Sequence, residues 1–246
     1  MPAELTEAFA LPYRDSRFWK KLLIGGGLLL LPVLFCFPLG FSLKYLEMRL
    51  EEDPQPLPEW DDWGAMFRKG AGLSLLLIAY AGLPLALFLL AVILLFEAGK
   101  VWQHGGSWEW LILSVAGGSF AGIILCLLAG FLCLLLAGFL PIALIRFALG
   151  GFRAAFQFKD MWQDATQNVR DYAGTYLTYA AVSGILLLTL WIGGAYFVSL
   201  PFLFLKILGV PFLLATGPLS LYLALVGAFL FARKYQELII LRMEVP

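Results

Sequence analysis

The chain has 246 residues, of which 61% are hydrophobic and only 14% are charged. A soluble domain carries about 45–50% apolar and about 25% charged residues, so the composition excludes a soluble globular protein. Disordered chains are poor in aromatic residues, which form 15% of this chain. The 17 basic residues are balanced by 17 acidic ones, so no basic surface for nucleic acid is expected. We predict an all-α, polytopic helical membrane protein.

Five apolar runs follow an interfacial N-terminus at 1–21. Because about 20 helical residues cover the ~30 Å hydrocarbon core, each run is a candidate membrane segment. Lys206 is the one charged residue inside them. The runs are 22–43, 71–96, 110–145, 173–199 and 201–232.

The number of crossings depends on two of these runs. Run 22–43 contains three consecutive glycines, Pro32 and Pro38, residues that break helices, so it forms either a spanning or a re-entrant hairpin. Run 110–145 crosses once or twice, which gives four to six transmembrane helices in all. The positive-inside rule favours four crossings plus an N-terminal hairpin, with 15 basic residues cytoplasmic and two outside. Both termini are then expected on the cytoplasmic side of the cell (inner) membrane.

Two polar linkers are expected to carry short amphipathic helices. In the linker 44–70, aromatic side chains recur at helical spacing after acidic residues, which suits a helix over 57–70 lying at the interface. The same pattern predicts an amphipathic helix over 155–172. The residues expected to contact the membrane interface or a partner are Trp60, Asp61, Asp62, Trp63, Phe67, Phe158 and Trp162.

The third run contains a repeat of eight residues in which an Ala-Gly pair recurs. Small residues let helix backbones approach closely in lipid. They serve either packing among the chain's own helices or an interface with another subunit. The glycines expected at helix contacts are Gly118, Gly122, Gly130 and Gly138.

The apolar runs offer little with which to perform chemistry. The single histidine, His104, cannot build a zinc or haem site alone, and no acidic residue lies within a run. We therefore expect no catalytic residue, cofactor or metal. The leading hypothesis is a non-enzymatic membrane scaffold or accessory subunit, whose partners are the lipid bilayer and other membrane subunits or a second copy. The alternative is a transporter or lipid-handling protein for an apolar solute.

The N-terminal half also resembles a family of uncharacterised polytopic membrane proteins from bacteria and archaea. The resemblance rests above all on the string Leu-Pro-Glu-Trp-Asp-Asp-Trp-Gly at 57–64, followed by Phe67 and Gly70. Shorter matches lie at 12–15, 19–21 and 24–26, whereas Phe41–Ser42–Leu43–Lys44 departs from the expected pattern. The resemblance implies a membrane location and a shared fold, and it implies no activity.

Overall fold

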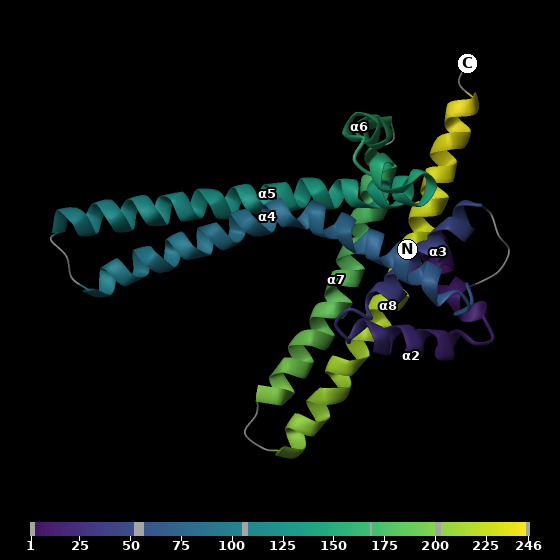
Figure 1. The fold of residues 1–246 in the computed structure, drawn as a ribbon, viewed down its shortest axis with the longest axis horizontal. Coiled ribbons are helices and arrows are strands. Elements are labelled where there is room, and N and C mark those ends of the chain that lie inside the picture. Colours follow the sequence, from purple (N-terminus) through teal and green to yellow (C-terminus); the bar gives the residue numbers. More distant parts are fainter. Residues whose placement is uncertain (1–2, 52–56, 105–107, 168, 200–202, 245–246) are drawn as a thin grey trace. The chain divides into compact units, whose positions relative to one another are not determined.

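The computed structural model describes residues 3–51, 57–104, 108–167, 169–199 and 203–244, and these residues form helices joined by short connections (Figure 1). No strand occurs among them. The elements in chain order are α1 (Ala3–Ala10), the 3-10 helix η1 (Leu11–Arg14), α2 (Phe18–Leu29), α3 (Cys36–Leu50), α4 (Trp63–His104), α5 (Trp108–Ala154), α6 (Phe158–Gln167), α7 (Val169–Ser199) and α8 (Leu203–Glu244).

Three helical stretches are long and apolar enough to cross a membrane, and a bent pair in α5 forms a fourth candidate. The three are Trp63–Glu97, Gly174–Ser199 and Gly209–Glu237, and the pair joins Gly118–Cys133 to Gly138–Ala154. The predicted helical membrane fold is therefore confirmed. Within the described residues, these candidates fall on the last four apolar runs, as the four-crossing arrangement requires.

Helix α5 continues through run 110–145 without reversing. Its two stretches are bent by 44°, whereas two antiparallel crossings would need a turn of about 180°. Pro141 lies inside the helix, and the backbone leaves helical geometry only at Gly151, where φ is 73°. Among the described residues, this run therefore supplies one candidate span, the bent pair.

The N-terminal run forms a helical hairpin, but the glycines do not break it. Gly25 and Gly26 lie within α2, and the chain turns at residues 30–35, where Val33 has a φ of 70°. Pro38 lies in the first turn of α3, where the missing N–H of proline has no helical partner to lose. Gly25 and Gly26 therefore have a packing role, which the sequence alone did not reveal.

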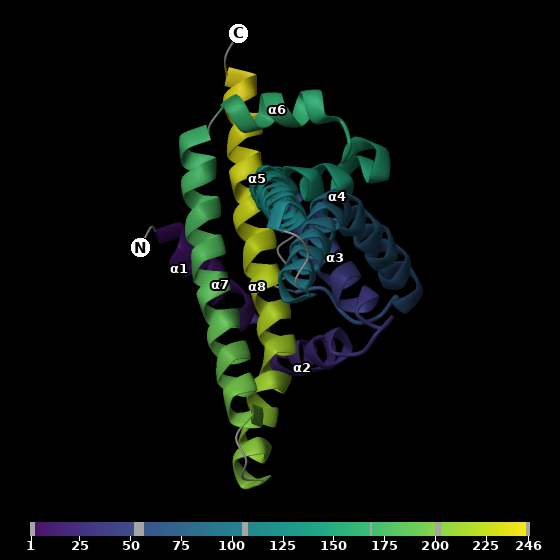
Figure 2. The same cartoon turned by 90° about the vertical axis from the view of Figure 1, so that its left-hand side faces the viewer.

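That role is close contact between α2 and α8 (Figure 2). A Cβ added at Gly26 would lie 2.4 Å from the backbone nitrogen of Pro218, and one at Gly217 would lie 2.2 Å from the carbonyl oxygen of Gly26. The two backbones touch because neither position carries a side chain. A buried apolar cluster that includes Phe41, Tyr45 and residues of α8 surrounds the crossing.

Helices α3 and α4 meet in the same way. A Cβ on Gly40 would lie 1.9 Å from the carbonyl oxygen of Met66, and one on Gly70 would lie 1.7 Å from that of Cys36. An ion pair between Lys69 and Glu47 joins the same two helices. Glycine is required at both positions because any side chain would push the helices apart.

Helix α7 runs alongside α8 in both views (Figures 1 and 2). The phenolic oxygen of Tyr179 donates a 2.7 Å hydrogen bond to the carbonyl of Leu223 and fills the space above Gly227. Helix α8 remains continuous through Pro211 and Pro218.

Residues 75–140 form a separate compact unit made of most of α4 and most of α5. Within it, a Cβ on Gly122 would lie 2.7 Å from a side-chain carbon of Leu95. Gly122 therefore packs α5 against α4 inside this unit.

Two substitutions in α2 test the backbone contact. Gly26→Ala places a methyl group against the α8 backbone, so we expect a loss of about 1–3 kcal/mol in the free energy of unfolding. Gly27→Ala is the matched control, because a Cβ there meets nothing within 4 Å and alanine favours the helix by about 1 kcal/mol over glycine. Denaturation of both variants in one detergent measures the difference. Equal stability of the two variants would contradict the contact.

Candidate functional site

The segment 57–62 is irregular, with bends at Leu57 and Trp60, and leads into α4, so the helix expected over 57–70 begins only at Trp63. Asp62 determines this start. Its carboxylate accepts a 2.9 Å hydrogen bond from the backbone N–H of Ala65, the bond expected of a residue that caps a helix N-terminus. Pro58 restricts the chain before it to extended conformations. Trp60 and Asp61 therefore precede the helix.

Lys21 is the centre of the polar contacts around this segment. Its ammonium nitrogen lies 2.8 Å from the carboxylate of Asp15 and 2.8 Å from that of Glu59, and it donates to the carbonyl of Leu57 at 3.4 Å. Only 4% of the Lys21 side chain is exposed. Although Lys21 lies in the N-terminal stretch expected at the membrane interface, its side chain is buried and joins the start of α2 to the segment 57–62.

Asp61 makes a second link, to α3. Its carboxylate accepts a 2.9 Å hydrogen bond from the ammonium group of Lys44. This bond, together with one from the Asp62 backbone N–H, holds the pKa of Asp61 below its usual value. Because the pair is exposed to solvent, its contribution to stability is small.

Aromatic contacts also link the segment 57–62 to α3 and α4. Trp60 stacks on Phe41 with ring centroids 4.3 Å apart and planes inclined by 15°, and on Trp63 at 5.3 Å. Phe37 contacts both Trp63 and Phe67. Trp60 is thus half-buried within the fold, whereas Trp63 and Phe67 remain partly exposed. Stacking of Trp60 on Phe41 makes it a packing residue.

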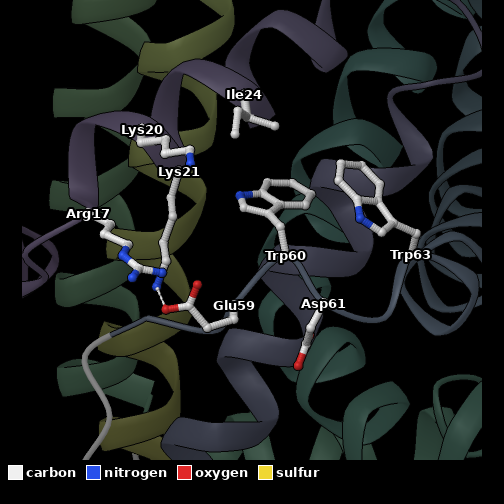
Figure 3. A pocket seen from close by; sticks show the side chains of 8 residues that line it. All are labelled: Arg17, Lys20, Lys21, Ile24, Glu59, Trp60, Asp61 and Trp63. Atoms are coloured by element: carbon white, nitrogen blue, oxygen red, sulfur yellow. Dashed lines mark ion pairs between the residues drawn. The ribbon is translucent and has the colours of Figure 1, made fainter.

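A cavity of about 310 Å³ opens between α2 and the segment 57–63 (Figure 3). Its lining combines cations, two carboxylates, two indoles and one aliphatic side chain. The lining residues are Arg17, Lys20, Lys21, Ile24, Glu59, Trp60, Asp61 and Trp63. The cavity thus places charged and aromatic groups side by side.

The indole N–H of Trp60 is buried and has no hydrogen-bond acceptor in the described part of the chain. Figure 3 shows this nitrogen on the edge of the ring turned toward Lys20 and Lys21, away from Trp63. Leaving such a donor unsatisfied costs about 1–3 kcal/mol. An acceptor in the cavity would remove this cost.

The second amphipathic helix is shorter than expected. It is α6, which ends at Gln167, and α7 starts at Val169. The side chains of Phe158 and Trp162 are exposed, and Met161 and Asp164 form the buried side.

Helix α6 is held by an ion pair that the spacing of residues did not predict. The guanidinium of Arg146 contacts the carboxylate of Asp164 at 2.6 Å and 3.0 Å through two nitrogens. Asp164 is only 5% exposed. The sequence did contain a signal for this ion pair, namely an acidic residue on the apolar side of α6. A buried carboxylate needs a cation as its partner.

The four small positions of α5 have different surroundings. Gly118 is half-buried, and Gly122 packs on Leu95. A Cβ at Gly130 or Gly138 would meet nothing within 4 Å. Among the described residues, no three metal-binding side chains converge.

The fold and these contacts define a helical protein with spans suited to a membrane. A family model described as a protein of unknown function, DUF4013, matches residues 24–194. The chain therefore belongs to the DUF4013 family, in agreement with the resemblance to an uncharacterised family. No curated protein and no solved structure matches it.

Adjacent lysines in α2 test the role of the buried ammonium group. Lys21→Met leaves the buried carboxylate of Asp15 without its cation, so we expect a loss of about 3–5 kcal/mol in the free energy of unfolding. Lys20→Met removes an exposed charge and should change stability by less than about 0.5 kcal/mol. Thermal unfolding in detergent distinguishes them. Similar melting temperatures for the two variants would contradict the proposed role of Lys21.

Proposed function

We propose that this membrane protein is a non-enzymatic scaffold or accessory subunit of a larger membrane complex. The observation that carries the proposal is the exposed, unfilled position at Gly130 on α5. The proposed partner surface is the face of α5 around this glycine, and the partner is a transmembrane helix of another subunit or of a second copy.

The contrast between two glycines on the same helix supports this proposal. Gly122 packs against Leu95 of α4. A Cβ added at Gly130, eight residues later, would meet nothing within 4 Å. Eight residues at 100° each rotate the helix face by about 80°, so the two glycines point to different neighbours. The first is used within the chain, and the second is available to another helix.

Large side chains border the position of Gly130. Leu127 is 70% exposed and Phe131 is 58% exposed, so the glycine forms a notch between two bulky apolar groups. Lipid supplies no hydrophobic drive for helix association, and close packing at small residues provides the attraction instead. A partner helix would fill the notch and contact both neighbours.

Helix α6 supplies a second surface for the same role. Arg146 and Asp164 hold it in place, while Phe158 and Trp162 face outward. Aromatic side chains of this kind suit the headgroup region, where a partner's linker would also lie. The acidic pair Asp61 and Asp62 is engaged in local contacts, so we assign the partner-facing role at the first linker to Trp63 and Phe67.

Substitution at Gly130 tests the proposal. Gly130→Leu fills the notch, so we expect about tenfold less association with a co-purified subunit or second copy in mild detergent. The unfolding temperature should stay unchanged, since no described side chain contacts the position. Native mass spectrometry of the purified chain and its complexes provides the measurement.

Gly174→Leu is the matched control, because this exposed glycine in α7 also meets nothing within 4 Å. It should leave association intact. A wild-type chain that is always monomeric and unaccompanied would overturn the scaffold proposal. Flux of an apolar solute across liposomes containing the chain alone would instead favour the alternative, a transporter or lipid-handling protein.

A further inference from the structure

We propose that the cavity between α2 and the segment 57–63 binds the phosphate of an anionic phospholipid headgroup. This inference does not rest on the scaffold proposal, whose main partner surface is the face of α5 around Gly130, although Trp63, to which that proposal gives a partner-facing role, also lines the cavity. It rests on the charges, the buried indole donor and the apolar side chains that meet at this cavity.

The cations that line the cavity outnumber the carboxylates once the ion-pair partners of each are counted. Glu59 is paired with Lys21 and Asp61 with Lys44, each at 2.9 Å or less. Arg17 and Lys20 make no side-chain ion pair with the described residues. Lys21 is shared by Asp15 and Glu59, so the cations Arg17, Lys20, Lys21 and Lys44 exceed the carboxylates of Asp15, Glu59 and Asp61 by one charge. This excess, together with the two cations that lack an ion-pair partner, favours an anion.

The donors in the cavity match the chemistry of a phosphate. A guanidinium and an ammonium group form charge-assisted hydrogen bonds with phosphate oxygens. The N–H of Trp60 adds a neutral donor that is buried and lacks an acceptor. A bound phosphate oxygen would satisfy it after a small adjustment of the surrounding side chains.

The apolar side chains around the cavity indicate that the anion is part of an amphiphile. Ile24 lines the cavity one helical turn after Lys20, and the neighbouring α2 residues Trp19 and Leu23 are exposed, at 64% and 62%. Exposed tryptophan and leucine on one helix face suit the boundary between headgroups and acyl chains. The headgroup would occupy the cavity, and the acyl chains would follow this face.

The volume is sufficient for a headgroup but not for a whole lipid. At about 310 Å³, the cavity is at the lower end of small-molecule sites, which measure about 300–1,000 Å³. We therefore infer that the cavity takes one phosphate-containing headgroup, with the rest of the lipid outside.

The test uses the full chain in detergent and native mass spectrometry with two lipids, dioleoylphosphatidylglycerol and dioleoylphosphatidylcholine. We expect one equivalent of phosphatidylglycerol to bind about tenfold more tightly than phosphatidylcholine. The double variant Arg17→Gln/Lys20→Gln should lose this preference, and Trp60→Phe should weaken phosphatidylglycerol binding about threefold by removing one neutral donor.

The matched control is Arg14→Gln/Arg153→Gln. It removes the same total charge at two exposed residues that do not line the cavity, so it should retain the preference. Equal binding of the two lipids by the wild type would overturn the proposal. An equal loss in the control would also overturn it, because it would indicate general charge attraction.

Calorimetry with sn-glycerol 3-phosphate distinguishes a lipid from a soluble ligand. No binding of this compound, together with selective binding of phosphatidylglycerol, supports the lipid headgroup. Tight binding that depends on Arg17 and Lys20 would support a phosphate site but overturn its assignment to lipid.

Discussion

A buried ammonium group with two carboxylates organises the N-terminal part of this protein. Removing a charge from water costs several kcal/mol unless partners replace the lost hydration. Lys21 meets this requirement by contacting Asp15 and Glu59, which lie on opposite sides of it in sequence. Because Lys21 needs both carboxylates nearby, its two ion pairs fix the path of the segment 57–62 along α2. The cavity, the stack on Trp60 and the start of α4 all depend on that path.

Glycine contacts provide the complementary apolar constraint. In a membrane, helices gain little by leaving lipid, so attraction between them depends on how closely they approach. The contacts Gly26–Pro218 and Gly40–Met66 bring backbones together on both sides of the N-terminal hairpin. Polar pairing then selects one arrangement among those that close packing permits. Neither constraint alone would determine both the distance and the register of these helices.

Hydropathy was sufficient to predict the helical membrane class and the positions of the four candidate spans, because the bilayer imposes length and apolarity on any helix that crosses it. It could not predict the role of Gly25 and Gly26, since a glycine that breaks a helix and one that admits a neighbour look alike in sequence. Lys21 and Lys20 are also adjacent and chemically identical. Only tertiary contacts distinguish the buried one from the exposed one, and the same is true of Asp164 and its partner Arg146.

The helix start at Trp63 illustrates a similar limit. The acids before it suited either the first turn of a helix or a cap, and the choice depends on whether Trp60 gains more from a helical position or from stacking on Phe41. The structure shows the stack, and residues 57–62 are not helical.

The distribution of charge connects these contacts to function. No aspartate, glutamate, lysine, arginine or histidine occurs from Gly70 to Phe96 or from Trp110 to Ile145. Ionisable side chains instead meet at Lys21 and at Arg146, next to the ends of helices. Recognition of charged groups by this protein is therefore expected where apolar helices end and polar segments begin. The two proposed ligands, a lipid headgroup near Lys21 and a partner subunit along α5, are compatible with each other. The headgroup would bind through charge at the helix ends, and the partner would bind through close packing along the helix.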